Sequence, residues 1–336
     1  MSRADSDPSQ AVESPNGAVP RPLPVVSVVI VNYNGAEVIA PCLKSLESCR
    51  LPMEIIVYDN ASTDDSDRIV ERDFPDVRLR RRPRNERFAR PNNLAMREAS
   101  GEFILLLNND TVVLSSAIER LVEYLRNHPE VGMAGPQLLN SDGTVQPSCS
   151  GFFTPWTHLF DMTFADRLFG RSRLVAAGPM TWFDFRTERE VDHLTAACVL
   201  MRRDALEDVG LFDERFTFYF NDMDLSMRFH AAGWPSVFVP SSRVIHRGGH
   251  ATRKALSVRP EMLTEFQWNA ILLSRKHYGW TGELWHRGVS AAGYLLRTVI
   301  WGLVSAVRDT EGARERFKTS LVFLKTVIFV YSFMQW

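Results

Sequence analysis

The chain has 336 residues, of which 45% are hydrophobic and 24% are charged, and its formal net charge is −1. This ordinary globular mix excludes a wholly disordered, collagen-like or disulfide-stapled protein, and the length allows roughly two domains. Because 39 Lys and Arg residues nearly balance 40 Asp and Glu residues, the composition does not indicate bulk nucleic-acid binding, and we expect no nucleic-acid partner. The four cysteines lack metal-site spacing, which favours reduced thiols and a cytoplasmic protein.

The N-terminal segment, residues 1–24, is rich in Ser, Pro, Asp and Ala and has no apolar stretch typical of a signal peptide. We expect it to be a disordered tail. A continuous β-branched run over residues 25–31 then predicts a strand buried on both faces. This strand ends in the turn residues Asn32, Tyr33 and Asn34, without the glycine-rich loop of a dinucleotide-binding or P-loop protein.

Strands and helices alternate through the first half of the chain. The patterns predict strands over residues 53–58, 77–80, 103–107 and 132–139, and helices over residues 36–49, 65–73, 92–100 and 115–127. This alternation favours an α/β layer with a largely parallel sheet. Ligands of such sheets bind beyond the carboxyl ends of the strands, which is where the polar clusters of this sequence fall.

The second half of the chain is less regular. Residues 140–190 carry many aromatic side chains and are expected to form an irregular layer of loops beside the sheet. The remaining predicted elements are strands over residues 194–201, 237–240 and 244–246, and helices over residues 203–209 and 222–232. From about residue 260 the pattern becomes all-helical.

Three residues that follow predicted strands are candidates for chemistry, and each has a simpler alternative. Asp59 can accept hydrogen bonds from a nucleobase or a ribose, or it can cap the next helix. Asp110 can hold a divalent cation such as Mg²⁺ or Mn²⁺ against a diphosphate, or it can serve a turn. His246 can be a metal ligand or an ordinary polar residue.

Two further acids lie at the start of a predicted helix. Asp222 and Asp224 are two residues apart, so their side chains point to different faces of that helix. One of them can therefore face a site while the other caps the helix or pairs with Arg228, four residues after Asp224.

An arginine-rich segment occupies residues 78–90. It is interpreted either as a strand at the edge of the sheet that charge protects from further pairing, or as a phosphate-binding patch. The edge strand is the simpler reading, and it leaves Arg84 or Arg87 free to reach the site.

Together these clusters resemble the family 2 glycosyltransferases of the GT-A fold, in particular their rhamnosyltransferase-like branch. The resemblance covers about residues 25–255 and rests on short motifs in a fixed order, at residues 28–34, 57–64, 85–93, 105–111, 196–198, 212–216, 222–228 and 244–249. It implies a GT-A-type, Rossmann-like, mixed and mostly parallel sheet flanked by helices. We therefore expect a catalytic domain over residues 25–255 and a C-terminal helical appendage over residues 256–336.

The resemblance also implies roles for single residues. It assigns a nucleotide-sugar, of the dTDP-rhamnose or UDP-hexose type, to the residues Asn32, Tyr33, Asn34, Asp59, Asn60, Ser62, Asn92 and Asn109. It assigns a divalent cation, Mg²⁺ or Mn²⁺, to Asp110 and His246, and the role of general base in an inverting transfer to Asp222. The implied acceptor is a polysaccharide or a lipid-linked glycan.

Four positions depart from the pattern of the family. Arg87 and Ala196 stand where glycine is usual, Asn221 stands where the acid before the base is often Glu, and Asn108 takes the place of an Asp. These departures leave open a second hypothesis, in which the chain is a catalytically degenerate module that binds a nucleotide-sugar without turnover.

The C-terminal helices have an amphipathic pattern. Apolar residues between 292 and 307 fill one half of a helical wheel, yet no stretch here reads as a clear membrane span. These helices can lie on a membrane, which would place the protein peripherally on the inner face. Alternatively, they pack on the catalytic domain or on a second subunit in a homodimer. A third hypothesis is a membrane-docked assembly component.

Overall fold

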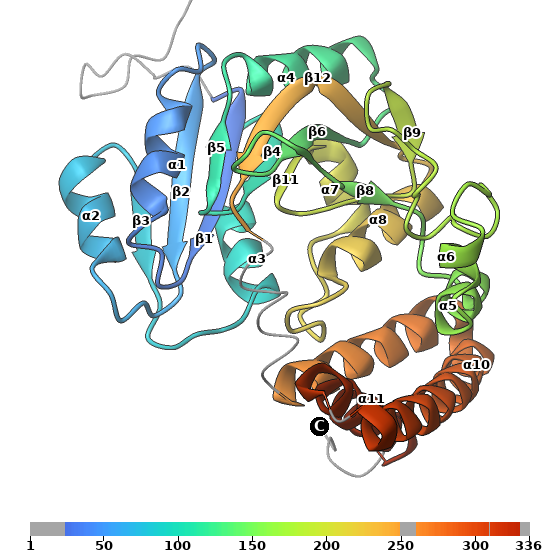
Figure 1. Cartoon of the computed structure of the whole chain (residues 1–336). Coiled ribbons are helices and arrows are strands. Elements are labelled where there is room, and N and C mark those ends of the chain that lie inside the picture. Colours follow the sequence, from blue (N-terminus) through green and yellow to red (C-terminus); the bar gives the residue numbers. More distant parts are fainter. Residues whose placement is uncertain (1–23, 249–259, 309, 330–336) are drawn as a thin grey trace, which may run out of the picture.

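The computed structural model describes residues 24–248, 260–308 and 310–329, and within them ten strands form one sheet with helices on both faces (Figure 1). Its main path runs β3 (Arg78–Arg81), β2 (Met53–Asp59), β1 (Val26–Asn32), β4 (Phe103–Leu107), β11 (Cys198–Arg202), β6 (Met133–Leu139), β12 (Ser236–His246) and β5 (Thr111–Val113). Two short strands, β7 (Val145–Gln146) and β9 (Arg189–Val191), pair outside this path. The expected tail and the expected boundary at residue 255 lie outside the described residues.

The sheet is mixed and mostly parallel, as predicted. β3, β2, β1 and β4 are parallel neighbours, and so are β6 and β12. β11 pairs antiparallel with both β4 and β6, so those two strands run in the same direction. Six strands therefore end at one edge of the sheet, and the antiparallel β11 begins at that edge.

Two apolar cores lie on the two faces of the sheet. Alternate residues of β1 point to opposite faces, so Val28 and Ile30 belong to one core and Val29 to the other. Helices α1 (Ile39–Leu46), α2 (Ser66–Asp73) and α4 (Ala117–Asn127) cover the first face. Helices α3 (Ala89–Glu98), α7 (Arg203–Val209) and α8 (Asn221–Ala231) cover the second.

Residues 140–190, the aromatic segment, were expected to form an irregular layer of loops, but they contain regular elements. This segment contains the helices α5 (Pro155–Met162) and α6 (Ala165–Leu168) and the strand β8 (Cys149–Ser150), which pairs with β10 (His193–Leu194) just after the segment. Helix α5 begins there because Thr154 and Thr157 form a capping box and proline occupies the first turn. The two short strands expected near the end of the domain are one strand, β12, with an irregularity in its pairing between Val239 and Arg243.

The C-terminal region is helical, as expected. It consists of α10 (Pro260–Arg308), which is kinked at Gly279, and α11 (Glu311–Phe329). The part of α10 before the kink packs on α8 through Leu273, which contacts Met223 and Met227 in a third apolar cluster. The part after the kink packs on α5 and α11, where Tyr294 meets Met162 and Val327. These helices form a lobe beneath the sheet domain in Figure 1.

Candidate active site

The predicted site residues gather at the edge where the parallel strands end. Asn32 and Asp59 close β1 and β2 and are paired in register. Asn108 directly follows β4, and its N–H donates to the carbonyl of Ala197, just before β11, at 2.9 Å. His246 is the last residue of β12 and pairs with Thr111 in β5. Residues far apart in sequence thus meet at one edge, as the strand order predicts.

A buried hydrogen-bond network joins the ends of β1, β2 and β4. The Asn32 Nδ2 donates to Asp59 Oδ1 at 2.9 Å and to Ser66 Oγ at 2.8 Å. The Asn32 Oδ1 accepts from Asn109 Nδ2 at 2.8 Å, and Asp59 Oδ2 accepts from the Ser62 N–H at 3.0 Å. Because Asn32 is 1% exposed and Asp59 3%, both act in this structure to hold the loops in place. A contact of either with a ligand stays a prediction.

The loops held by this network carry accessible side chains. Tyr33 is 49% exposed, and Asn34 is exposed with a left-handed φ of 49°. A Cβ on Gly35 would lie 2.3 Å from Asn32 Oδ1, so only glycine allows the chain to pass this close to the network. Tyr33 and Asn34 are therefore the residues of this group that a ligand can reach from solvent.

Asn60 and Asn92 have structural partners in the chain. The Asn60 Nδ2 donates to the Arg87 carbonyl at 2.7 Å and to Asn85 Oδ1 at 3.0 Å, which fixes the loop after β3. The buried Asn92 Nδ2 donates to the Phe88 carbonyl at 2.9 Å, at the start of α3. Both amide groups therefore bind other parts of the chain in this structure, and their direct contact with a nucleotide-sugar stays a prediction.

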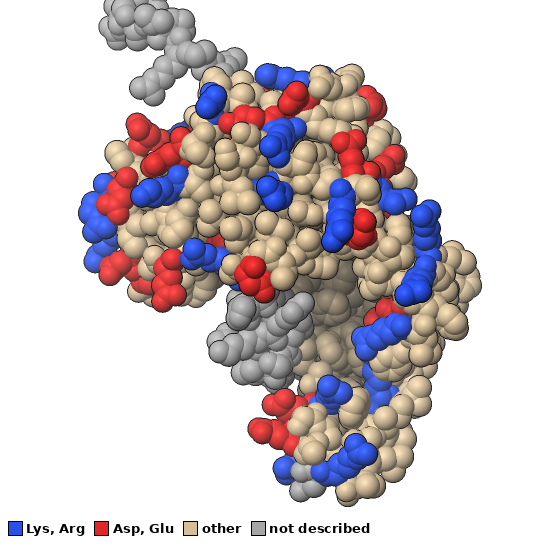
Figure 2. Space-filling model, turned by 45° about the horizontal axis from the view of Figure 1, so that its top comes forward, with Lys and Arg blue, Asp and Glu red and all other residues tan. Residues whose placement is uncertain are grey.

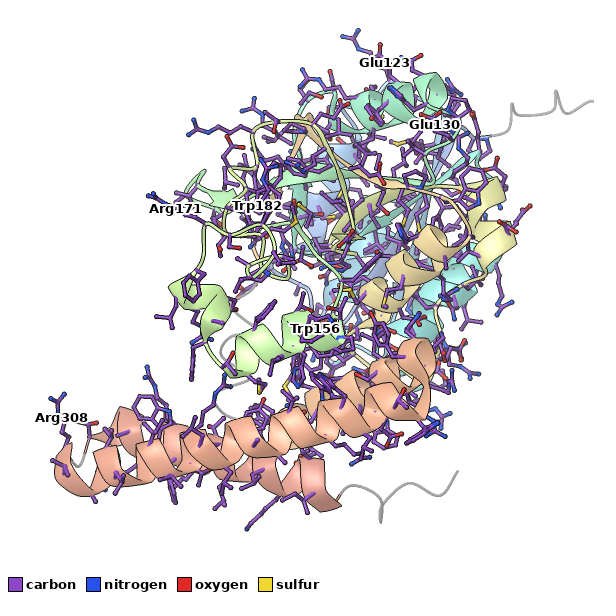
Figure 3. The ribbon with its side chains drawn as sticks, turned by 90° about the vertical axis from the view of Figure 1, so that its right-hand side faces the viewer. Glu123, Glu130, Trp156, Arg171, Trp182 and Arg308 are labelled. Atoms are coloured by element: carbon purple, nitrogen blue, oxygen red, sulfur yellow. The ribbon has the colours of Figure 1, made fainter. Side chains whose placement is uncertain are left out.

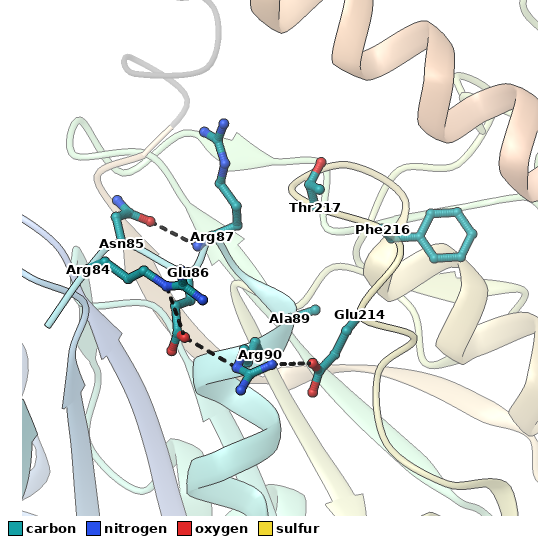
Figure 4. Close-up of a pocket in the computed structure, with 9 residues that line it drawn as sticks. All are labelled: Arg84, Asn85, Glu86, Arg87, Ala89, Arg90, Glu214, Phe216 and Thr217. Atoms are coloured by element: carbon teal, nitrogen blue, oxygen red, sulfur yellow. Dashed lines mark hydrogen bonds and ion pairs between the residues drawn. The ribbon is translucent and has the colours of Figure 1, made fainter. Parts of the chain in front are cut away.

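A pocket of about 350 Å³ lies between this loop and residues 214–217 (Figure 4). Arg84, Arg87 and Arg90 line it, and Glu86 lies 3.7 Å from Arg84 and 3.3 Å from Arg90. Arg87 has a φ of 66°, which explains why glycine suits this position. Its side chain extends away from the ion pairs of its neighbours in Figure 4. A guanidinium so placed is suited to a phosphate. The arginines of β3 itself lie on the edge strand and pair with acids, as the simpler reading expected.

Asp110 and His246 face each other at the end of β12. The Asp110 Oδ1 lies 3.3 Å from His246 Nε2. The His246 Nδ1 is 2.7 Å from Gln146 Oε1, and Gln146 Nε2 donates to Asn140 Oδ1 at 3.2 Å. The amide of Gln146 therefore accepts from the Nδ1–H of the histidine, which leaves the Nε2 lone pair directed toward Asp110.

These two side chains fit a divalent cation whose remaining ligands come from a substrate and water. A Cβ on Gly248 would lie 2.5 Å from His246 Nε2 and 2.7 Å from Asp110 Oδ2, so glycine keeps this position open. No group of three or more His, Cys, Asp or Glu residues that could hold a metal occurs in the described part of the chain. Mg²⁺ commonly takes one or two carboxylates and completes its shell with water and phosphate oxygens.

Asp222 occupies the first turn of α8, where its carboxylate meets donors from three directions. Its Oδ1 accepts from the Met223 N–H at 3.0 Å, and its Oδ2 accepts from the Ala196 N–H at 3.2 Å. The His193 Nε2 lies 3.5 Å from Oδ2. Desolvation raises the pKa of Asp222. His193 and the two N–H groups together lower this pKa by more, so the net pKa lies below its usual range. With 29% of its side chain exposed, Asp222 is an ionised carboxylate that a substrate hydroxyl can approach.

Two residues that contact His246 and Asp222 were not predicted from the sequence. Gln146 lies in the two-residue strand β7, and His193 lies in the equally short β10, where its Nδ1 is 2.9 Å from Ser150 Oγ. Neither residue carries a periodic signal: Gln146 lies inside the aromatic segment, and His193 directly precedes the strand predicted over residues 194–201. Asn221, which precedes Asp222, is 2% exposed, and both polar atoms of its side chain lack a hydrogen-bond partner among the described residues.

Asp224 has a structural role, as one of the two alternatives expected. It is fully buried, and its carboxylate lies 3.0 Å from Arg228 Nε, 2.7 Å from Lys276 Nζ and 2.8 Å from His277 Nε2. Desolvation raises the pKa of Asp224, but His277, Lys276 and Arg228 outweigh it and hold the pKa below its usual range. Because Lys276 and His277 belong to α10, this cluster fastens the helix that carries Asp222 to the C-terminal lobe.

Sequence comparisons identify similar proteins. One similar protein is the N-acetylglucosaminyl-diphospho-decaprenol L-rhamnosyltransferase of Mycobacterium tuberculosis. It is 28% identical over 285 residues, which cover 76% of this chain and 86% of the relative. The O-antigen biosynthesis protein RfbC of Myxococcus xanthus is 33% identical over 242 residues. That match covers 70% of this chain but only 18% of RfbC.

Solved structures share the fold. The mannosyltransferase PcManGT of Pyrobaculum calidifontis, in complex with GDP-Man and Mn²⁺, aligns with a TM-score of 0.54 and 17% identity over 93% of this chain and 88% of its own. Residues 1–349 of TarS from Staphylococcus aureus, in complex with UDP-GlcNAc, align with a TM-score of 0.51 and 17% identity over 90% and 81%. The fold is thus that of the GT-A glycosyltransferases. Since the sequence model of glycosyl transferase family 2 matches residues 27–210, more than half of the chain, the protein belongs to glycosyl transferase family 2.

Proposed function

We propose that this glycosyltransferase is inverting and moves a sugar from a dTDP-rhamnose or UDP-hexose type of donor to a polysaccharide or lipid-linked glycan. The observation that carries this proposal is the accessible, ionised carboxylate of Asp222, held by the Ala196 N–H beside the Asp110 motif. The Mycobacterium tuberculosis relative, named as an L-rhamnosyltransferase of a diphospho-decaprenol glycan, supports both the donor and the lipid-linked acceptor.

The donor is proposed to bind between the loops after β1 and β2 and the arginine-lined pocket. Tyr33 and Asn34 are accessible to the nucleoside, while Asn32, Asp59 and Asn60 shape the loops around it. The other predicted donor residues, Ser62, Asn92 and Asn109, are hydrogen-bonded parts of the same framework. Arg87, on the loop that Asn60 fixes, is placed for the diphosphate.

Asp110 and His246 would hold a Mg²⁺ or Mn²⁺ ion, whose chemistry here is to neutralise the negative charge that develops on the departing diphosphate. Gln146 keeps the imidazole oriented by accepting from its Nδ1–H. The PcManGT complex contains Mn²⁺, which is in keeping with this assignment.

Asp222 acts as the general base. Its carboxylate takes the proton of the acceptor hydroxyl while the oxygen forms a bond to the anomeric carbon. The bond from that carbon to the diphosphate oxygen breaks in the same displacement, and the nucleoside diphosphate leaves with the electron pair. A single displacement with the base opposite the leaving group inverts the anomeric configuration. We further propose a cytoplasmic protein that works at the inner face of the membrane, where a lipid-linked acceptor is accessible.

The test is turnover by the purified chain. UDP-, dTDP- and GDP-sugars are each incubated with Mg²⁺ or Mn²⁺ and a polyprenyl-diphosphate-linked N-acetylglucosamine, and nucleoside diphosphate release and product stereochemistry are measured. The proposal expects release with one donor class and inversion at the anomeric carbon. Binding of a nucleotide-sugar without any release would instead support a degenerate binding module, the reading that Asn108, Asn221 and Arg87 motivate.

A further inference from the structure

The part of α10 after the kink exposes a continuous apolar face. Its side chains are 41% to 84% exposed, and we call the set the α10 apolar face: Leu295, Leu296, Val299, Ile300, Leu303 and Val307. These residues recur every three or four positions, so they lie on one side of the helix. They belong to the apolar half of the helical wheel predicted from the sequence, and the structure leaves them unpacked within the described part of the chain.

The same face continues toward the kink. Trp280, Leu284 and Trp285 are 66%, 61% and 39% exposed, and none of the exposed residues between 280 and 307 is charged. At 1.5 Å per residue this uncharged strip is about 40 Å long. Exposed apolar surface of that extent on a folded protein marks an interaction site.

The opposite side of the helix is occupied by the protein. Glu283, His286, Ser290 and Tyr294 are buried there, against α5 and α11. The helix from Met262 to Arg308 is long and apolar enough to cross a bilayer, with a mean hydropathy of 1.3 in its best window. A helix that buries a glutamate and a histidine against its own protein on one side, and exposes only uncharged residues on the other, is suited to lie in the plane of an interface.

Aromatic and basic residues flank the apolar face. Trp156 of α5 is 62% exposed, and its ring centroid is 5.8 Å from that of Trp285. Figure 3 shows Trp156 above α10 and Arg308 at the far end of this helix. Exposed Arg316, Lys318 and Lys325 lie on the neighbouring α11, which also exposes Glu311 and Glu315, and Figure 2 shows basic side chains on the lobe with some acidic ones among them. Tryptophan and basic residues around an apolar face are typical of helices that bind anionic membranes.

We propose that the α10 apolar face docks on the surface of an anionic phospholipid bilayer. The leucines and valines enter the boundary between head groups and acyl chains, while the basic residues of α11 meet the lipid phosphates. Resting on the proposed function, this docking would bring the site to a lipid-linked acceptor. The docking itself requires no donor and no turnover.

The experiment measures flotation of the full chain with vesicles of phosphatidylcholine, with and without phosphatidylglycerol. The test variant is Val299→Glu/Leu303→Glu, which changes two exposed positions at the centre of the face. The matched control is Ser115→Glu/Asn127→Glu, which adds the same charge at exposed positions beside and within α4, at the far end of the molecule in Figure 1. Circular dichroism checks that all three proteins are folded.

The wild type and the control are expected to float with the anionic vesicles. The test variant is expected to lose about tenfold or more of its partition, since two apolar side chains no longer enter the bilayer. Equal partition of the test variant and the wild type would overturn the proposal. So would wild type that resists alkaline extraction, as a membrane span would, or a lipid-free dimer that the test variant dissociates while neither protein floats. Donor turnover on the same preparations tests the proposed function separately, because flotation is measured without donor.

Discussion

Replacement of Asp224 by asparagine tests whether charge fastens helix α8, which carries Asp222 and Asp224, to the C-terminal lobe. The carboxylate is fully buried and lies within 3.0 Å of nitrogen atoms of Arg228, Lys276 and His277. Asp224→Asn keeps the shape of the side chain but removes the negative charge, so Arg228 loses its carboxylate partner in a buried setting, while Lys276 keeps only its ion pair with Asp213 at 2.8 Å.

Breaking a buried ion pair by removing one partner costs about 3–5 kcal/mol, and we expect a loss of that size in the free energy of unfolding. Asp65→Asn is the matched control because it breaks an ion pair with Arg68, 3.1 Å long, in which both side chains are more than 75% exposed. Exposed pairs contribute about 0–1 kcal/mol. Both variants remove one negative charge, so the difference between their losses in the free energy of unfolding measures the effect of burial.

Urea denaturation at neutral pH, followed by circular dichroism, measures both changes. A loss for Asp224→Asn that is no larger than the loss for Asp65→Asn would refute the reasoning. Limited proteolysis adds a local measurement, since a weakened cluster is expected to release α10 from α8 before the sheet domain unfolds.

Three further predictions address pH, metal and donor. Burial lowers the pKa of His158 to about 4, so the unfolded chain binds a proton first and the free energy of unfolding falls as pH drops from 6.5 toward 4. This loss is about 3 kcal/mol at most, and we expect it to be smaller in His158→Asn than in wild type when urea titrations at pH 7 and pH 5 are compared. An equal loss in the variant and the wild type would contradict the lowered pKa of His158. Asp110→Asn is expected to raise the Mn²⁺ concentration for half-maximal turnover by about tenfold or more, and an unaltered requirement would remove Asp110 from the metal site. Because Arg87 has a left-handed φ, Arg87→Gly is expected to raise the unfolding free energy by up to about 1 kcal/mol while weakening donor binding about tenfold in calorimetry; unweakened binding would exclude its contact with the diphosphate.

The sheet and its functional edge were predictable because their signals are local. The β-branched run of β1 and the Phe-Ile-Leu run of β4 are buried on both faces, and polar residues follow each directly. The parallel order of such strands then places Asn32, Asp59 and Asp110 at one edge. The local pattern left the choice between Asp222 and Asp224 open, and only the family resemblance favoured Asp222. The burial of Asp224 depends on Lys276 and His277, which lie about fifty residues away in sequence.

The residues that contact Asp222 and His246 had no local signal. His193 and Gln146 lie in two-residue strands, which are too short to show a period, and both act through contacts with distant residues. Helix α5 has a local start signal, because Thr154 is the N-cap, accepts from the Thr157 N–H and is followed by Pro155, but its aromatic residues obscure the helical spacing. Tertiary contacts, more than local propensity, thus determine the surroundings of Asp222 and His246.

The central claim is that Asp222 accepts the proton of the acceptor hydroxyl. The most direct measurement compares wild type and Asp222→Asn for donor affinity by calorimetry and for sugar transfer to the lipid-linked acceptor. We expect transfer by Asp222→Asn to fall by about 10²–10⁴ fold while its donor affinity stays within about threefold of wild type. Full transfer activity in Asp222→Asn with normal donor binding would contradict it.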